Sequence, residues 1–470
     1  MLFFITWITS RNANNESYFI GNRTSRWYIV AYGMIGASLS GVTFVSVPGD
    51  VGVKHFAYLQ MVIGYMIGYA VIAGILLPLY YRLNLTSIYS YLKGRLGRNS
   101  YKTGAAFFIL SRVIGASFRL YVVVNVLQTF VFDRWNIPFI VTVSVFIILI
   151  LAYTFQGGVK TIVWTDTLQT TFMLLAMFLT VWFISQEMGL GLGEVIKKIT
   201  NSAHTSVWVT DWHDKKYFLK HILGGAFIAI AMTGLDQEMM QKNISCKNVG
   251  ESQKNMITFS IVLFFVNILF LALGALLYIY AVSKNMELPA KSDDVFPGIA
   301  LNFLGPVAGI VFIIGLISAA FPSADGALTA LTTSFCLDIL ELDRGDEKKL
   351  KKNRYLVHFG FSILILGCIL WFRALNDDAV INKLFTAANF TYGPLLGLFA
   401  FGLFSGTGVK DKWVPIVAII PPILCFILNL NSVEWLGGYQ FGNEMLILNG
   451  LLTFIGLFII SKRRVEVILV

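Results

Sequence analysis

An ionisable residue stands inside an apolar stretch of the second half of the chain. Asp325 lies in the segment 318–338, and at helical spacing it shares one face with Ser318, Pro322, Thr329 and Thr332. Pro322 has no amide hydrogen to donate to the Ser318 carbonyl, so that backbone oxygen needs another partner. Because a carboxylate, hydroxyls and a free carbonyl are ligands for a hard cation, this face is a candidate ion site. A kinked packing helix whose hydroxyls bond to its own carbonyls is the alternative.

A second carboxylate is expected at membrane depth in an earlier apolar segment. Asp166 follows Val-Trp-Thr and has Gln169 and Thr170 close by. A lone aspartate near a helix end can also cap the helix or reach the membrane surface. Two acids that converge with hydroxyls and free carbonyls are more simply explained as a site for Na⁺ or H⁺.

Two arginines could act on these acids. Arg112 and Arg119 are seven positions apart, which places them on one face of a helix. They could neutralise Asp166 and Asp325, or they could bind an anionic substrate. Of the two alternatives, we expect pairing with the acids.

The composition indicates a polytopic membrane protein. Hydrophobic residues make up 56% of the 470 residues, charged residues 13%, and the mean hydropathy is +0.72, whereas a soluble domain carries about 25% charged residues. The net charge of +10 comes from basic residues in short loops, so membrane topology explains it better than a nucleic-acid partner. The four cysteines and five histidines show neither disulfide nor zinc spacing, and no nucleophile–base pair or phosphate-binding loop indicates an enzyme.

Twelve apolar segments have the length of membrane spans. The short apolar start of the chain is expected to be the tail of a first helix, since it has no signal-peptide cleavage pattern. The predicted spans are 27–48, 55–81, 103–132, 137–155, 161–187, 219–235, 256–283, 306–338, 355–373, 380–404, 413–430 and 444–460.

Lysine and arginine gather in alternate connections, as expected if basic loops stay in the cytoplasm. These basic residues are Arg11, Arg23 and Arg26; Arg82, Lys93, Arg95, Arg98 and Lys102; Lys160; Lys242, Lys247 and Lys254; Arg344, Lys348, Lys349, Lys351, Lys352 and Arg354; Lys410 and Lys412; and Lys462, Arg463 and Arg464. We therefore expect a cytoplasmic C-terminus and an external loop at 188–218.

Five spans on each side of the long loop have opposite orientations, as an inverted repeat requires. In such folds the first helix of each half is broken near the ligand. Glycines mark both candidate breaks, around Gly33, Gly36 and Gly41 and around Gly224 and Gly234, although glycines in membrane helices also permit close packing. The predicted parts are 1–26, a remnant of a first helix with a cytoplasmic loop; 27–187, the first repeat; 188–218, the external loop; 219–404, the second repeat; and 405–470, two further helices and a short tail.

Four motifs, in order along the chain, carry a specific resemblance. They are Gly-Ala-Ser-Leu-Ser-Gly-Val-Thr-Phe-Val-Ser-Val-Pro-Gly (36–49), Gly-Gly-Val-Lys-Thr-Ile-Val-Trp-Thr-Asp-Thr-Leu-Gln-Thr (157–170), Gly-Leu-Asp-Gln-Glu-Met-Met-Gln-Lys (234–242) and 318–338. Together they resemble the sodium/solute symporter family. The resemblance implies an all-α polytopic membrane protein of the leucine-transporter-type fold, with an inverted five-helix repeat and additional N- and C-terminal helices.

The resemblance also implies a set of Na⁺ ligands. The site shared by the family uses backbone oxygens that fall on Gly36, Leu39 and Ala319, and two hydroxyl residues that fall on Pro322 and Ser323. Pro322 departs from this pattern because it has no hydroxyl, and the freed Ser318 carbonyl could replace it in part.

A second Na⁺ site found in some relatives falls on Asp166, Ser323 and Asp325. Asp325 stands where the family has a serine. The extra carboxylate could strengthen cation binding, or it could be protonated and couple H⁺ instead.

The implied substrate pocket lies between the first broken helix and the third, sixth and tenth helices of the fold. Its expected residues are Thr43, Ser46, Arg119, Thr233, Asn389 and Tyr392. Family substrates include sugars, sialic acids, amino acids, vitamins, iodide and monocarboxylates, and the sequence selects none of them.

We therefore expect a secondary active transporter in which Na⁺ drives the uptake of a small polar solute by alternating access. An H⁺-coupled symporter of the same fold and a membrane solute sensor that does not transport are the alternatives. The expected partners are the solute, Na⁺ and the lipid bilayer, with no nucleic acid and no obligate protein partner. The expected location is the plasma (inner) membrane.

Overall fold

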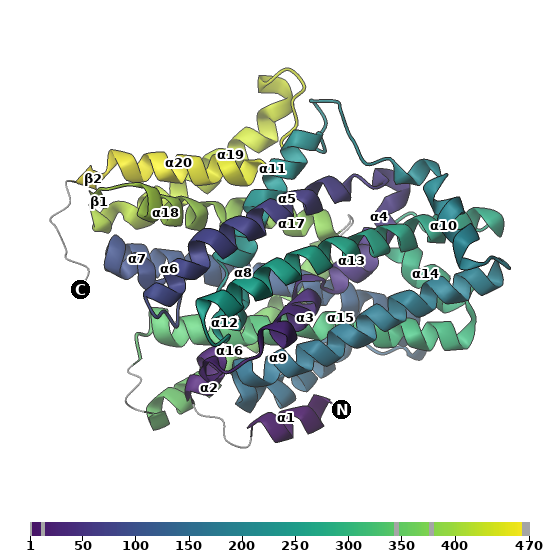
Figure 1. Cartoon of the computed structure of the whole chain (residues 1–470), viewed down its shortest axis with the longest axis horizontal. Coiled ribbons are helices and arrows are strands. Elements are labelled where there is room, and N and C mark those ends of the chain that lie inside the picture. The colour runs from purple at the N-terminus through teal and green to yellow at the C-terminus, as the bar shows by residue number, and fades with distance from the viewer. Residues whose placement is uncertain (1, 11–14, 343–346, 376–379, 463–470) are drawn as a thin grey trace.

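The computed structural model describes residues 2–10, 15–342, 347–375 and 380–462, and these residues form an elongated bundle of helices (Figure 1). The basic residues Arg11, Arg344, Arg463 and Arg464 lie outside this description. The first ten helices are α1 (Leu2–Ser10), α2 (Asn15–Ile20), α3 (Trp27–Ser38), α4 (Gly41–Lys54), α5 (Tyr58–Val71), α6 (Leu77–Arg82), α7 (Ser90–Arg95), α8 (Arg98–Leu127), α9 (Phe139–Glu187) and α10 (Leu192–Thr200).

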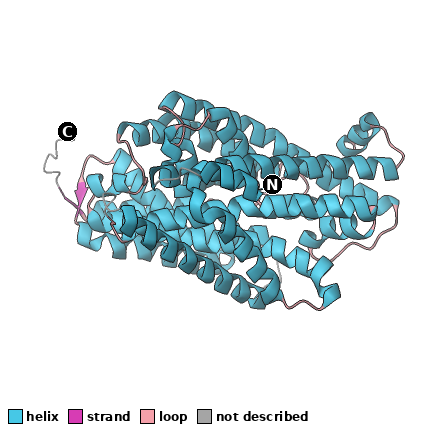
Figure 2. Cartoon of the chain, turned by 90° about the horizontal axis from the view of Figure 1, so that it is seen from below, coloured by secondary structure: helices cyan, strands magenta, loops and turns pink. Residues whose placement is uncertain are grey.

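The second half of the chain is also helical, apart from one short strand pair (Figure 2). Its helices are α11 (Phe218–Ala229), α12 (Gln237–Ile244), α13 (Val249–Ser283), α14 (Val295–Asn302), α15 (Gly305–Ser334), α16 (Glu347–Leu375), α17 (Val380–Thr391), α18 (Gly393–Phe404), α19 (Val414–Trp435) and α20 (Met445–Ile459). The strands β1 (Gly408–Val409) and β2 (Ser461–Lys462) pair antiparallel. Single turns of 3-10 helix lie at Gly21–Arg23, Asp133–Trp135, Ala203–Thr205, Ser292–Asp294 and Asp411–Trp413.

In the part of the chain that the structure describes, four π-helical turns extend longer helices. They follow α5, α8, α11 and α15, at Ile72–Leu76, Gln128–Phe132, Ile230–Gly234 and Phe335–Ile339.

The spans predicted from hydropathy coincide with helices of the structure. Within the described residues, seven helices are long and apolar enough to cross a membrane, and three bent helix pairs pass the same test together. The shorter apolar helices Phe139–Thr154 and Met445–Ile459 correspond to the two remaining predicted spans. Exposed apolar side chains on the outer helices, such as Phe178 and Ile423, are suited to lipid contact.

The predicted boundaries fail most clearly at the sixth span. This span was expected to end at residue 235 and to be followed by a cytoplasmic loop that contains Lys242. Instead the chain bends and continues as α12, and Lys242 is buried in the bundle. The first span is also longer than expected, because α4 continues through Pro48 to Lys54.

Among the described helices, three pairs are bent at a short interruption. The bend is 58° between α3 and α4, 66° between Phe218–Gly234 and α12, and 41° between Leu384–Thr391 and α18. The first two bends lie beside the predicted glycine clusters. At the second, the Asp236 side chain accepts hydrogen bonds from the amides of Glu238 and Met239 and so caps α12.

Different elements lie at the two ends of the bundle. In Figure 1, β1, β2 and α7 lie at the left end, whereas α10 and α14 lie at the right. The broken helices α3–α4 and α11–α12 run between these ends and bring their interruptions into the middle of the molecule.

Candidate functional site

The break between α3 and α4 leaves backbone groups without helical partners. Leu39 and Ser40 have non-helical backbone angles, so carbonyls in the last turn of α3 lack an amide four residues on. Glycines let neighbouring helices come close here. A Cβ on Gly36 would lie 2.2 Å from Thr170 Oγ1 of α9, and one on Gly41 would lie 2.1 Å from Val123 Cγ2 of α8. Free carbonyl oxygens in a tightly packed interior can bind a cation.

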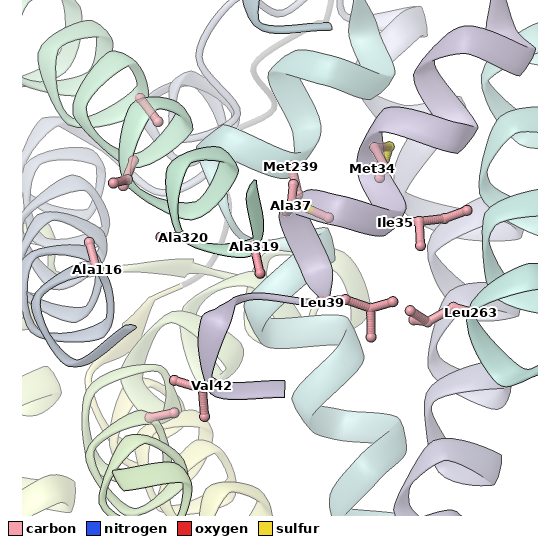
Figure 3. Close-up of a cluster of buried hydrophobic side chains, with 14 of the residues drawn as sticks. Met34, Ile35, Ala37, Leu39, Val42, Ala116, Met239, Leu263, Ala319 and Ala320 are labelled. Atoms are coloured by element: carbon pink, nitrogen blue, oxygen red, sulfur yellow. The ribbon is translucent and has the colours of Figure 1, made fainter. Parts of the chain in front are cut away.

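The small-residue side of α15 adjoins this break. Ala319 and Ala320 lie beside the interruption and near Leu39 and Val42 (Figure 3). The Ser323 hydroxyl donates to the Ala320 carbonyl at 2.8 Å, which leaves the lone pairs of its oxygen available to a cation.

Asp325 points into the protein, as its position on the polar face of α15 predicted. Its side chain is fully buried, and the Tyr153 hydroxyl donates to Asp325 Oδ2 at 2.8 Å. Among the described residues, Asp325 Oδ1 and the nearby Thr329 hydroxyl have no hydrogen-bond partner. A buried carboxylate with one free oxygen is therefore held in the candidate ion site.

Asp166 pairs with a lysine rather than with an arginine. Lys242 Nζ of α12 lies 2.7 Å from Asp166 Oδ2 and 3.2 Å from Glu238 Oε1. Asp166 and Lys242 also lie close enough to Asp325 to interact with it electrostatically. Asp166 Oδ1 and both polar atoms of the Gln169 amide lack hydrogen-bond partners in the described part of the chain. The two acids are thus close together, and each keeps a free oxygen.

The expected pairing of Arg112 and Arg119 with Asp166 and Asp325 is wrong for both arginines in the described part of the chain. Arg112 forms ion pairs with Asp236, at 3.5 Å, and with Glu238. The Tyr392 hydroxyl donates a hydrogen bond of 2.8 Å to Asp236 Oδ2, the same oxygen that Arg112 approaches. The carboxylates of α12 lie near Arg112 because α12 turns into the bundle, and this was not expected from the sequence.

The buried charges form one network across α8, α9, α12 and α15. Its carboxylates are Asp166, Asp236, Glu238 and Asp325, and its paired cations are Arg112 and Lys242. Because the carboxylates outnumber the cations that pair with them, the network has room for an additional positive charge. In the described residues no cluster of three His, Cys, Asp or Glu side chains could hold a metal, so a cation here would depend on carbonyl and hydroxyl oxygens as well.

A small cavity adjoins the break between α3 and α4. It has a volume of about 70 Å³ and includes Ser38, Thr43, Tyr69, Arg119 and Thr233 in its lining. The half-buried Arg119 guanidinium makes no ion pair or hydrogen bond to any residue that the structure describes, and its Nε is buried without a partner. Because a buried guanidinium without an acceptor is costly, this cavity is suited to an anion.

The predicted substrate residues divide into three groups. Thr43, Arg119 and Thr233 line the cavity together. Ser46 is buried and its hydroxyl has no partner in the described residues, but it lies outside the lining, and Tyr392 belongs to the charge network. Asn389 faces a second, larger cavity.

Several residues of the site were not predicted as site residues from the sequence. Tyr58, Tyr65 and Tyr69 supply an aromatic wall, and Lys242 and Glu238 supply paired charges. The sequence contained a signal for these charges. Asp236, Glu238 and Lys242 lie within seven residues next to a glycine-rich apolar helix, and charged residues at membrane depth are costly unless they are paired.

Comparison with known proteins assigns the chain to a family. The model described as "Sodium:solute symporter family" matches residues 18–406. The chain belongs to this family. It is a Na⁺-coupled secondary active transporter with several membrane-spanning helices, and it is not an enzyme.

Individual relatives are distant in sequence but cover most of the chain. The sodium/sialic acid symporter SiaT of Proteus mirabilis is 23% identical over 89% of this chain and 86% of its own length. The sodium/sialic acid symporter NanT of Aliivibrio fischeri is 23% identical over 94% of this chain and 88% of its own. A sodium-dependent multivitamin transporter of Oryctolagus cuniculus is 25% identical over 80% of this chain and 59% of its own.

Solved structures show the same fold. A substrate-bound, outward-open Na⁺-coupled sialic acid symporter superposes with a TM-score of 0.82 at 20% identity, covering 98% of this chain and 97% of that one. Mhp1, a nucleobase-cation-symport-1 family transporter, superposes with a TM-score of 0.56 at 12% identity, covering 95% and 93%. These similarities establish the leucine-transporter-type fold of this chain.

Proposed function

We propose that this symporter takes up a small organic anion whose carboxylate binds Arg119, and that a sialic acid is the first compound to test. The observation that carries the proposal is the unpaired, half-buried Arg119 guanidinium in the cavity beside the α3–α4 break. A guanidinium binds a carboxylate through two parallel hydrogen bonds. The sialic acid symporters among the relatives make this class of solute a natural choice.

We further propose that Na⁺ binds on the opposite side of the same break. The backbone oxygens of Gly36, Leu39, Ala319 and Ser318 and the hydroxyl of Ser323 would supply neutral ligands, and the free oxygens of Asp166 and Asp325 would supply negative charge. Na⁺ and solute would then bind to the two sides of one interruption, so that each favours the arrangement of α3 and α4 that the other requires.

The proposed orientation follows from the charge of the loops. The end that carries β1, β2 and the basic connections would face the cytoplasm, and the end that carries α10 would face outward. The protein would lie in the plasma (inner) membrane and act without an obligate protein partner.

Uptake of radiolabelled sialic acid into proteoliposomes with and without a Na⁺ gradient tests the proposal. Arg119→Gln should abolish uptake, and Arg119→Lys should restore only part of it, because lysine keeps the charge but not the paired hydrogen bonds. Arg134→Gln, a change at an exposed arginine that follows the same helix, is the control. Uptake by Arg119→Gln at the wild-type rate would contradict the assignment of Arg119.

A further inference from the structure

A second cavity lies next to the first. It is nearer to the end of the molecule that carries α10, because the C-terminal part of α4 and the start of α5 line it. Its volume is about 360 Å³, several times that of the cavity at Arg119. It is enclosed by the end of α4, the start of α5, the segment before α11, α17 and the connection between α19 and α20. It is large enough for a small organic molecule.

The lining of this outer cavity is rich in positive charge. Lys54, Lys215 and Lys216 contribute ammonium groups, and Asp50 is the one carboxylate among the described residues of the lining. Asp50 is already engaged, because it forms an ion pair with Lys54 and accepts a hydrogen bond of 2.7 Å from Ser292. The cavity therefore presents a surplus of cations to whatever enters it.

Lys215 and Lys216 are held in place by their backbone rather than by their charges. The Lys216 carbonyl accepts a hydrogen bond of 3.3 Å from the buried Gln60 amide, and the Lys215 carbonyl lies against Gly442. Among the described residues neither ammonium group forms an ion pair, although the Asp214 and Asp50 carboxylates lie near enough to Lys216 to act on its charge. Burial lowers the pKa of Lys216, and a bound anion would favour its charged form.

The two cavities share part of their walls. Tyr58 of α5 and Phe385 of α17 line both of them, so these rings separate the lysines from Arg119. A solute that passes these two side chains moves from the lysines of the outer cavity to Arg119 of the inner one. The charges therefore lie in series along one route to the candidate solute site.

We propose that the outer cavity is a second binding site for the transported anion, in which Lys215 and Lys216 hold its carboxylate before it passes Tyr58 and Phe385 to Arg119. The inference rests on the proposed function, since it takes the solute to be an organic anion. A cationic, partly enclosed surface concentrates anions and accelerates their capture, and this effect weakens as salt rises. The site would thus govern how efficiently solute is captured, and Arg119 would govern whether it is transported.

The first experiment measures the kinetics of sialic acid uptake for Lys215→Gln/Lys216→Gln. We expect the double variant to raise KM about threefold or more at low ionic strength, to leave kcat near the wild-type value, and to lose most of the salt dependence of kcat/KM. The matched control is Lys197→Gln/Lys198→Gln, a neighbouring lysine pair that is exposed on α10 and absent from the lining of the cavity. Equal KM and equal salt dependence in the two double variants would overturn the outer site.

The second experiment measures equilibrium binding of radiolabelled sialic acid to purified Arg119→Gln protein. We expect weak, saturable binding that disappears when Lys215→Gln/Lys216→Gln is added. No saturable binding to Arg119→Gln would overturn the outer site while leaving Arg119 as the inner one. If inorganic phosphate displaced the bound sialic acid completely at equal concentration, the cavity would be a general anion site and the proposal would be wrong. If the wild type transports a neutral solute and no carboxylate, the proposed function and the outer site both fail.

Discussion

Asp325 has one carboxylate oxygen that accepts a hydrogen bond and one that does not. Tyr153 donates to Oδ2, whereas Oδ1 has no hydrogen-bond partner among the described residues, and Asp166 lies near enough to act on this carboxylate. In a protein interior such an arrangement persists when something else compensates the free charge. Lys242 compensates the charge of Asp166 at Oδ2. A bound Na⁺ would compensate the oxygens that have no partner, Oδ1 of Asp166 and Oδ1 of Asp325.

Replacing Asp325 should therefore change the dependence of transport on Na⁺. Asp325→Asn is expected to raise the Na⁺ concentration for half-maximal uptake about tenfold, which corresponds to roughly 1.4 kcal/mol, because one charged ligand is lost. Asp325→Ser should have a smaller effect, since serine is the residue that the family resemblance implies at this position. The control is Asp338→Asn on the same helical run, where Tyr101 and Ser334 already bond to the carboxylate. Wild-type Na⁺ dependence in Asp325→Asn would remove the residue from the ion site.

Lys242 should matter more for stability than a loop lysine would. Lys242→Gln leaves Asp166 and Glu238 with uncompensated charge, and breaking a buried ion pair in this way costs about 3–5 kcal/mol. We expect a lower Tm for the detergent-solubilised protein, with partial recovery in Asp166→Asn/Lys242→Gln. Lys247→Gln, at an exposed lysine just after α12, should leave the Tm unchanged. Simple addition of the two single effects in the double variant would mean that the pair is not coupled.

At the scale of the elements, the two broken helices could be predicted from the sequence. The burial of α12 inside the bundle could not. The glycines Gly36 and Gly41 predict the first break, and Gly234 predicts the second, because glycine is the residue type that interrupts an apolar helix. The apolar stretch ends near residue 235, so the sequence predicts that Lys242 lies with Lys247 and Lys254 in a cytoplasmic loop. Only the fold brings Arg112 and Asp166 to that segment, so the compensation that allows its burial is not visible in local sequence.

The contact between Gly36 and α9 provides a test of the first break. Gly36→Ala would place a Cβ 2.2 Å from Thr170 Oγ1, and such overpacking typically costs about 1–3 kcal/mol. We expect reduced uptake and a lower Tm, with partial rescue by Thr170→Ala, which removes the clashing hydroxyl. Gly74→Ala is the control, because a Cβ there meets nothing within 4 Å. If Thr170→Ala brought no recovery, the close approach would not be the cause.

At the scale of the whole molecule, the order of helices and the fold were accessible from hydropathy and motif order. The division into two inverted repeats, 27–187 and 219–404, and the direction of insertion remain predictions. They depend on loop charge, which describes how the chain meets the two sides of a membrane rather than how its helices pack.

Cysteine labelling in intact cells tests the direction of insertion. Lys198→Cys should react with a membrane-impermeant maleimide, whereas Lys412→Cys should react only after the membrane is permeabilised. Both side chains are exposed, so access from one side of the membrane is the variable. The native cysteines Cys246, Cys336 and Cys425 are buried, and a parallel measurement on the unmodified chain supplies the background. The reverse labelling pattern would invert the topology.

The four π-helical turns determine where the spans can change in length. Each bonds i to i+5 and so carries one residue more than an α-helical turn. A single deletion within Ile72–Leu76, Gln128–Phe132, Ile230–Gly234 or Phe335–Ile339 can close the turn into regular α-helix while both flanks keep their facing. A deletion elsewhere in a span would rotate the following half by about 100°. Natural length variants of this chain should therefore concentrate their one-residue gaps at these turns, including the one that precedes Asp236.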